Sequence, residues 1–528
     1  MMSGNATRPG VPHAAAPQDR LPRRGFLQAG AAAAAGLALP SWAQAKAASR
    51  PGHEIVAADA VTLSRWIRTR QVSCREVMVA YLAQIDRVNP QVNAIVTLQD
   101  REQLLAQASE RDRQLAAGRV MGWLHGIPQA PKDLAATAGI VTTQGSPLFK
   151  DYVPKTDAVI VERARRHGAV LIGKTNTPEF GLGSHTYNSV FGTTLNAYDA
   201  RWCAGGSSGG AAVALATHML PVADGSDMMG SLRNPAAFNN VFGLRPSQGR
   251  VPYGPTGEVF VQQLGYEGPM GRTVADVAML LSVQAGFDAR VPLSLDDDPQ
   301  RFTHGLKRDF KGTRIGWLGD LNGYLATEPG VMPLCESALK SFEALGCRID
   351  AVQPAYSPEA LWKTWLTLRH FTIANAAGPL YQDPAKRALM KPEALWEIEG
   401  GLGLKADEVW AASVQRTRWY QSLLALFQQH DYLVLPSAQV FPFDAQQHWP
   451  REINGRAMDT YHRWMEVVVG PTLAGLPVLN VPAGFSAAGQ PMGLQVIGKP
   501  RQDFEVLQLG HAYEQAAPWV RRRPSPLA

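Results

Sequence analysis

The chain of 528 residues is 45% hydrophobic and only 18% charged, so it can bury a large core and lacks the composition of a disordered protein. Its formal charge is +6, and because residues 1–45 hold four arginines and one aspartate, the remainder carries only +3. That weak excess, without basic clusters interleaved with aromatic residues, excludes the signature of a nucleic-acid-binding protein. Four cysteines are too few for a disulfide scaffold, and twelve histidines without ligand spacing predict no metal site and no cofactor.

The N-terminus has the features of an export signal. Arg23 and Arg24 precede the apolar run 29–39, and an Ala-Gln-Ala sequence at 43–45 follows it. This order is typical of a twin-arginine (Tat) signal peptide, and the run is far shorter than the ~20 residues that span a bilayer. We therefore expect residues 1–45 to be removed, leaving a soluble periplasmic protein, residues 46–528, that is not attached to the membrane.

The next segment, residues 46–118, has a helical pattern and contains no candidate catalytic residue. Residues 60–115 follow helical periodicity, with Leu63, Ile67 and Val77 on one side. The Asn-Pro pair at 89–90 predicts a helix break, and residues 94–98 predict a short strand.

A lysine follows at the end of an apolar run. Residues 122–131 contain two glycines and two prolines and lead directly to Lys132. Most lysines are solvated surface charges, but this setting favours a rigid and partly buried position. Burial lowers a lysine pKa from about 10.4, so Lys132 becomes a possible general base.

Strand–helix alternation after Lys132 predicts an α/β fold. Residues 158–167 predict a helix, with Arg163, Arg165 and Arg166 on a solvated face. Residues 168–175 match the nucleotide-binding P-loop pattern, but the apolar residues 169–172 are themselves the expected strand, and Thr177-Pro178 stands where the helix should start. We therefore do not interpret this match as a nucleotide site.

The most informative stretch runs from residue 205 to 233. Two Gly/Ser-rich segments, 205–210 and 224–231, flank the apolar residues 211–222, which predict a buried helix. A flexible linker has similar composition but would not lead into a core helix. The pattern of residues 205–209 also fits a nucleophile elbow, but the polar residues 196–201 before it predict no strand. Two tight serine loops brought to one place are the better interpretation, and a serine nucleophile needs a base.

The rest of the chain predicts strands at 313–318, 348–352, 433–436, 478–482 and 493–498 and a helix at 333–345. Residues 362–464 contain seven of the thirteen tryptophans. They are interpreted either as core or as an apolar substrate wall, since ligand pockets are mostly apolar and aromatic.

These residues carry a resemblance to a known family. Lys132 after its apolar run, Ser207 in the first Gly/Ser segment and Ser231 in the second are similar in kind and order to the motifs of the amidase signature family. The glycine-rich segments 243–250 and 268–276 also resemble that family. The resemblance covers roughly residues 55–515. It implies one α/β domain, with a central mixed β-sheet surrounded by helices.

The resemblance also implies a mechanism. Ser231 would be the nucleophile, Ser207, after a cis peptide bond from Gly206, would relay the proton, and Lys132 would be the base. Backbone N–H groups of residues 228–231 (Met228, Met229, Gly230 and Ser231) would form the oxyanion hole.

Three further residues of this loop follow from the same resemblance. Asp227 and Arg233 would order the loop. Met229 stands where the family usually has glycine, so it either strains a backbone with positive φ or narrows the acyl pocket.

The predicted function is a periplasmic amidase acting on a small-molecule amide, bulky or aryl, with esters and carbamates left open. A glutamyl-tRNA amidotransferase-like enzyme, which would need partner proteins, and a non-catalytic binding protein on the same fold are the alternatives. A homodimer is also left open.

Overall fold

The computed structural model describes residues 50–261 and 263–524 of the protein. They belong to one compact unit, Ala48–Ala528. The predicted Tat signal, residues 1–45, lies outside the described residues. No helix in the described ranges is long and apolar enough to cross a membrane.

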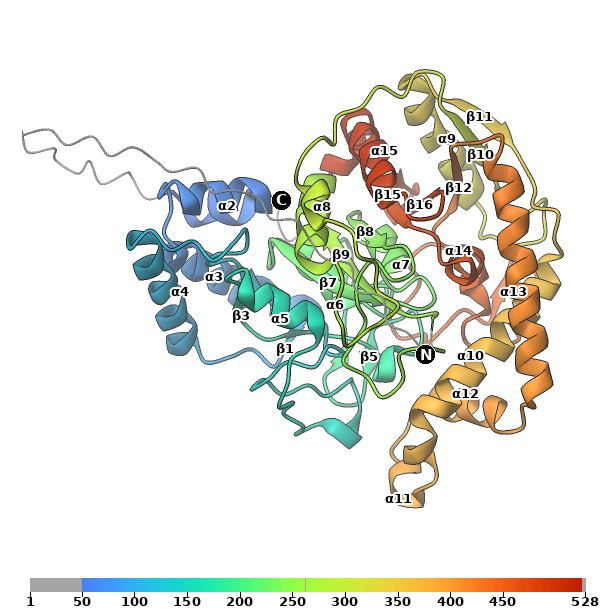
Figure 1. The fold of residues 1–528 in the computed structure, drawn as a ribbon, viewed down its shortest axis with the longest axis horizontal. Helices are drawn as coiled ribbons and strands as arrows, with labels where there is room; N and C mark the ends of the chain where they lie inside the picture. Colours follow the sequence, from blue (N-terminus) through green and yellow to red (C-terminus); the bar gives the residue numbers. More distant parts are fainter. Residues whose placement is uncertain (1–49, 262, 525–528) are drawn as a thin grey trace, which may run out of the picture. The chain divides into compact units, whose positions relative to one another are not determined.

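Four helices open the described chain and are drawn in blue shades in Figure 1: α1 (Gly52–Ala57), α2 (Ala60–Arg68), α3 (Cys74–Val92) and α4 (Arg101–Ala116). The predicted break at residues 89–90 is wrong by about one turn, because α3 continues through Pro90 to Val92. Asn93 (φ 50°) then adopts the left-handed conformation. The Asn89 carboxamide accepts hydrogen bonds from the backbone N–H groups of residues 94 and 95, so it ties down the chain beyond the helix end.

In the described residues, an eight-stranded mixed sheet forms the centre of the fold, with the order β11-β10-β12-β16-β15-β8-β9-β7. The pairs β10–β11 and β10–β12 are parallel, and the other pairs are antiparallel. The strands are β7 (Val222–Asp227), β8 (Phe242–Arg245), β9 (Tyr266–Gly271), β10 (Arg314–Trp317), β11 (Arg348–Ala351), β12 (Tyr432–Pro436), β15 (Val478–Phe485) and β16 (Pro491–Gly498). The predicted α/β fold with a central mixed sheet is confirmed, as are the five predicted strands at the C-terminal side.

Short two-stranded pairings lie outside this sheet: β1 (Ile95–Val96) with β4 (Lys174–Thr175), β2 (Pro128–Gln129) with β3 (Val170–Leu171), β5 (Tyr187–Asn188) with β6 (Gly192–Thr193), and β13 (Glu452–Ile453) with β14 (Arg456–Ala457). The remaining α-helices are α5 (Val159–Arg166), α6 (Gly209–Ala216), α7 (Arg233–Phe238), α8 (Val274–Gln284), α9 (Val331–Ala344), α10 (Pro358–Tyr381), α11 (Pro384–Arg387), α12 (Pro392–Leu402), α13 (Ala406–Phe427), α14 (Val469–Ala474) and α15 (Asp503–Ala516). Figure 1 shows α10, α12 and α13, in orange shades, side by side.

The apolar stretch 211–222 is not one helix, which corrects the sequence interpretation. Helix α6 ends at Ala216, and Val222 already begins strand β7. His218 (φ 60°) is left-handed and turns the chain between the two elements. Both elements are buried, so hydrophobicity alone did not distinguish helix from strand.

The arginines of α5 differ from one another. Arg163 donates to the backbone carbonyls of residues 284–287, so it joins α5 to the end of α8 instead of facing solvent as predicted. Arg166 is exposed and Arg165 is half-buried.

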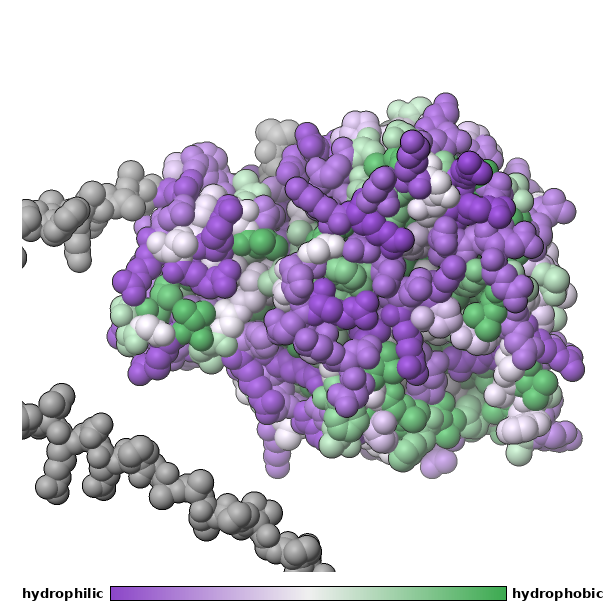
Figure 2. All heavy atoms as spheres, turned by 45° about the horizontal axis from the view of Figure 1, so that its top comes forward, coloured by the Kyte–Doolittle hydropathy of each residue, from purple (hydrophilic) through white to green (hydrophobic). Residues whose placement is uncertain are grey.

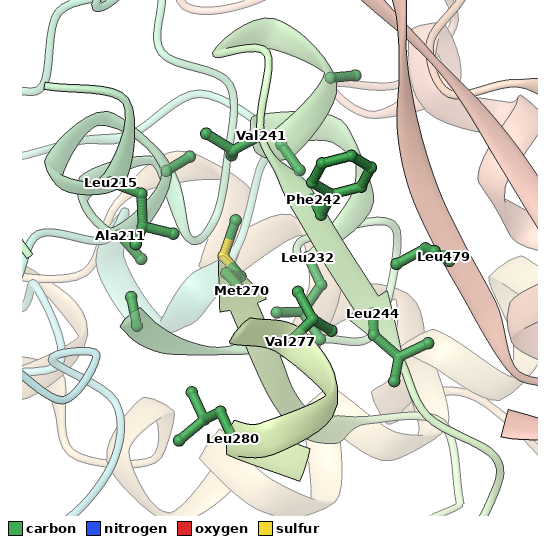
Figure 3. Close-up of a cluster of buried hydrophobic side chains, with 14 of the residues drawn as sticks. Ala211, Leu215, Leu232, Val241, Phe242, Leu244, Met270, Val277, Leu280 and Leu479 are labelled. Atoms are coloured by element: carbon green, nitrogen blue, oxygen red, sulfur yellow. The ribbon is translucent and has the colours of Figure 1, made fainter. Parts of the chain in front are cut away.

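Buried side chains from several elements anchor the nucleophile region (Figure 3). Leu215 of α6, Phe242 of β8, Met270 of β9 and Leu479 of β15 are all fully buried in one cluster. Leu232, the residue after Ser231, is part of the same cluster and is also fully buried. The core therefore fixes the backbone next to Ser231.

The displayed surface of the protein is mostly hydrophilic. Figure 2 shows hydrophilic residues over most of the displayed face, with hydrophobic residues gathered in smaller patches. All four cysteines are buried and form no disulfide.

Candidate active site

Lys132 lies at the centre of a cluster of serines. Its Nζ donates to the Oγ atoms of Ser207 at 2.7 Å, Ser208 at 2.9 Å and Ser226 at 3.0 Å. The lysine is 1% exposed, and its backbone N–H donates to the Asp224 carboxylate at 3.0 Å. The structure thus brings two of the predicted catalytic residues, Lys132 and Ser207, into direct contact.

The environment of Lys132 favours its neutral form. Burial lowers its pKa to about 7, although the carboxylates of Asp227, Asp224 and Glu267 oppose that shift. The prediction of a buried lysine with a lowered pKa is confirmed. Near neutral pH a large fraction of Lys132 can therefore accept a proton.

The Ser207 loop is held by close backbone contacts. The Gly206–Ser207 peptide bond is cis, as the family resemblance implies. The Gly206 N–H donates to Asn234 Oδ1 at 3.2 Å. Gly205 has φ 71°, and a Cβ there would lie 2.7 Å from the same Asn234 oxygen, so glycine is required at that position. Helix α6 begins two residues after Ser207 and carries the loop on a buried element.

Ser231 lies in the short loop between β7 and α7 and is 6% exposed. The Asp227 carboxylate accepts hydrogen bonds from the Gly230 N–H at 2.9 Å and the Leu232 N–H at 3.2 Å. Arg233 donates to the same carboxylate from Nε and a terminal nitrogen, both at 2.9 Å. These bonds connect both sides of Ser231 to one buried ion pair.

The buried charge of Asp227 is fully compensated. Burial opposes ionisation of Asp227, but the charges and hydrogen bonds of Arg233 and Arg245 outweigh it and hold the pKa of Asp227 well below its usual range. Arg233 also reaches three acceptors outside the loop: the Val468 carbonyl, the Thr472 hydroxyl and the Gln495 carboxamide. This geometry fits the expected ordering role of Asp227 and Arg233.

One expected oxyanion donor is committed elsewhere. The Gly230 N–H donates to Asp227, so it does not face the cavity that Ser231 lines, and the expectation for Gly230 needs correction. Met228, Met229 and Ser231 do line that cavity. The N–H groups of Met229 and Ser231 form no hydrogen bond within the described part of the chain, so they are available as donors.

The backbone conformation of Met229 distinguishes between strain at this position and a narrower cavity. In the described residues Met229 is not among those with positive φ, whereas Gly230 has φ 79°. Met229 is therefore unstrained, and its buried side chain narrows the cavity.

Two adjoining cavities form the site. The inner one, of about 90 Å³, is lined by Ser207, Ser226 and Ser231. The outer one has a volume of about 800 Å³. Six residues line both cavities and join them: Leu134, Phe180, Leu182, Met228, Tyr253 and Ile373. The shared wall is mostly apolar, and that favours a ligand with an apolar body.

The tryptophans of residues 362–464 do not form this wall. No tryptophan is among the described residues that line either cavity. Four of them (Trp362, Trp365, Trp419 and Trp464) are buried in the core. The region reaches the cavities through other side chains, such as Ile373, so the interpretation as an apolar wall of tryptophans is wrong.

The P-loop-like segment holds no phosphate site. Lys174 lies in β4 with no exposed surface, and its Nζ donates to the Ala135 carbonyl at 2.5 Å and Thr137 Oγ1 at 2.7 Å. Strand β3 occupies residues 170–171, as expected. Within the described ranges, no group of three or more His, Cys, Asp or Glu side chains could hold a metal ion.

Sequence reasoning missed Ser208, Ser226 and Asp224 as neighbours of Lys132. Asp224 and Ser226 are alternate residues of β7, so they face the same side of the strand. Recognising residues 222–227 as a strand would have placed them together. The interpretation of residues 224–231 as a Gly/Ser-rich loop concealed that signal.

The fold and this site define a class of protein. A family model described as Amidase matches residues 76–507. The chain therefore belongs to the amidase signature family, and it is a hydrolase of amide carbon–nitrogen bonds.

Three similar proteins illustrate the range of this family. An acylamidase from Rhodococcus erythropolis is 34% identical over 88% of this chain and 97% of its own. A glutamyl-tRNA(Gln) amidotransferase subunit from Thermosynechococcus vestitus is also 34% identical, over 88% of this chain and 98% of its own. The crystal structure of a bacterial aryl acylamidase has a TM-score of 0.82 and 29% identity, covering 88% of this chain and 96% of that one.

Proposed function

We propose that the protein hydrolyses carboxylic amides through an acyl-enzyme, with Ser231 as nucleophile, Ser207 as proton relay and Lys132 as base. One observation carries the proposal: the 2.7 Å hydrogen bond between Lys132 Nζ and Ser207 Oγ, beside a cavity that Ser231 also lines. With Lys132 neutral, the Ser207 hydroxyl is the donor in this bond. Ser–Lys pairs are established variants of the catalytic triad.

The chemistry follows from these positions. Ser231 Oγ attacks the amide carbon while its proton passes to Ser207, whose own proton passes to neutral Lys132. The N–H groups of Met229 and Ser231 stabilise the developing oxyanion, and each such donor lowers the barrier by about 3–4 kcal/mol. The C–N bond breaks as the relay returns a proton to the leaving amine. Water then cleaves the acyl-enzyme by the same route.

The proposed substrate is an amide with a bulky apolar or aryl group. The mostly apolar wall shared by the two cavities supports this, as does the similarity to an acylamidase and an aryl acylamidase. Esters and carbamates are further substrates of the same chemistry.

A second candidate function is that of a glutamyl-tRNA amidotransferase component, because a protein of that kind is equally identical to this chain. The apolar cavity wall favours the first function. Glutaminase activity that exceeds anilide hydrolysis in the purified protein would favour the second. A non-catalytic binding protein would show neither activity.

We also propose that the protein is exported to the periplasm by the Tat pathway. The twin arginines before the apolar run support this. Arg23→Lys together with Arg24→Lys should leave the precursor in the cytoplasm, as fractionation and immunoblotting would show. Normal export of the double variant would contradict the assignment.

The experiment that tests the function is detection of the acyl-enzyme. The protein is mixed with an activated aryl ester and an aryl amide, quenched within one turnover, and weighed intact by mass spectrometry. We expect an acyl adduct on Ser231 that is absent from Ser231→Ala, whose hydrolysis falls to background. The exposed Ser413→Ala variant is the matched control and should form the adduct normally. An adduct on any other residue would overturn the assignment.

A further inference from the structure

Two polar side chains in the inner cavity have no part in the proposed hydrolysis. Arg369 of α10 is 3% exposed, and His462, which precedes Arg463–Val468, is 2% exposed. Both line the cavity with Ser207 and Ser231. Buried polar groups in a mostly apolar pocket fix the orientation of a ligand and give it specificity.

The charge of Arg369 is compensated by Glu397, but one of its terminal nitrogens can still donate a hydrogen bond to a ligand. Its Nε forms an ion pair with Glu397, and a terminal nitrogen donates to Tyr461 Oη at 2.7 Å. The other terminal nitrogen faces Met228 Sδ at 3.5 Å, and a thioether is a weak acceptor. The pair of Arg369 and Glu397 has no net charge, so the site favours a neutral acceptor over a carboxylate.

His462 has unused hydrogen-bonding capacity on both sides of its ring. Both ring nitrogens are buried and have no hydrogen-bond partner in the described structure. Burial lowers the pKa of His462 well below its usual range, so the ring is neutral. A neutral imidazole donates from one nitrogen and accepts at the other. Unpaired buried groups of this kind reject a ligand that cannot pair with them.

We infer that Arg369 and His462 form a polar subsite that binds a neutral hydroxyl or carboxamide group of the amide substrate. Such groups both donate and accept hydrogen bonds, so they match the imidazole and the guanidinium together. The apolar body of the same substrate lies against the wall shared with the outer cavity. This inference rests on the proposed function and specifies its substrate class.

The test is a panel of matched amides. Each set has a hydroxyl, carboxamide, methyl or carboxylate group at one position, on the acyl side in some sets and on the amine side in others. We expect the wild-type kcat/KM to be about tenfold higher for the hydroxyl or carboxamide member than for the methyl member in at least one set. His462→Phe, which keeps a ring but removes both nitrogens, should lower that ratio to near one while the methyl member is still hydrolysed.

A second variant addresses the guanidinium. Arg369→Met alone would remove the arginine that compensates the buried Glu397 carboxylate, so Arg369→Met is combined with Glu397→Met, and the preference should again fall. The matched control is His430→Phe, because His430 is also buried but does not line the cavity. Its selectivity ratio should equal that of the wild type.

The outcomes separate this inference from the proposed function. Hydrolysis of the panel with no preference for the polar members, or with a preference that His462→Phe retains, would overturn the subsite. A preference for the carboxylate member would overturn its neutral character. In each of these cases Ser231-dependent hydrolysis persists and the proposed function stands. A wild-type protein that hydrolyses no amide of the panel would contradict the function and the subsite together.

Discussion

Two regions of the molecule meet at the inner cavity and are built differently. Residues 122–276 place Lys132, Ser207 and Ser231 on short loops between buried strands and helices, and each loop is held by several hydrogen bonds. Residues 358–464 are mainly helical and contribute Arg369, Ile373 and His462 to the cavity wall.

The two regions differ in whether their polar groups are already paired within the protein. In the first region Asp227 and Arg233 satisfy one another, so the loop geometry is rigid. In the second region the two ring nitrogens of His462 have no hydrogen-bond partner among the described residues, which leaves capacity for a ligand. We propose that the first region supplies the chemistry and that the second supplies the selectivity. Variants in the first region should therefore lower the hydrolysis of all amides alike, whereas variants in the second region should change the preference among amides.

The largest effect is expected for Lys132→Ala. Removing the base should lower amide hydrolysis by roughly 10²- to 10⁴-fold for every substrate. In the wild type, kcat/KM should rise with pH through about 7, because Lys132 accepts a proton only after it loses its own. In Lys132→Ala the rise of kcat/KM near pH 7 should disappear, and the remaining activity should increase only with the hydroxide concentration. pH–rate profiles measure both effects, with the exposed Lys311→Ala as control, and an unchanged profile in Lys132→Ala would contradict the assignment.

Arg233→Met should destabilise the first region. It removes one of the two arginines that compensate Asp227 and takes one hydrogen bond away from each of three buried acceptors. Breaking a buried ion pair costs about 3–5 kcal/mol in the free energy of unfolding, which urea denaturation would measure. Arg418→Met, at an exposed position of α13, should change it little. Equal stability of the two variants would show that Asp227 does not depend on Arg233.

Ser208→Ala tests which serine relays the proton. It removes one of three hydroxyl partners of Lys132, so kcat should fall by about 3- to 10-fold, the value of one hydrogen bond. Ser207→Ala should cost far more, and more for an amide than for an activated ester whose leaving group needs no proton. Steady-state kinetics on a matched amide and ester compare the two. A Ser208→Ala defect as large as that of Ser207→Ala, with the same amide bias, would assign the relay to Ser208 instead.

The smallest effect is expected for Ile373→Ala in the second region. Ile373 lines both cavities but is only partly buried. Each methylene removed from its side chain should weaken apolar contact with the substrate by a fraction of ~0.8 kcal/mol. We therefore expect kcat/KM for an aryl amide to fall by about two- to fivefold. Acetamide turnover should not change. The exposed Leu402→Ala is the control. Equal losses for both substrates would show that Ile373 acts on the chemistry and not on selectivity.

Part of the site was predictable from the sequence, because its signals are local. An apolar run rich in glycine and proline indicated that Lys132 is buried, and two Gly/Ser segments indicated the serine loops. The strand β7 was missed because only its first two residues are apolar, while residues 224–227 have the composition of a Gly/Ser-rich loop. The commitment of the Gly230 N–H to Asp227 was also missed, because it depends on how one loop turns.

The sequence alone determined the α/β class, five of the eight strands of the central sheet, the buried lysine and the order of the three residues that resemble a family triad, since composition, periodicity and motifs are properties of neighbouring residues. Only the tertiary structure decided what surrounds them. Arg369, Glu397 and Tyr461 are separated by 28 and 64 residues, and no pattern in the chain predicts that they join. Long-range packing of α10, α12 and the segment before Arg463–Val468 brings them together. The same packing places His462 beside the serines, because burial in a shared core depends on the whole fold.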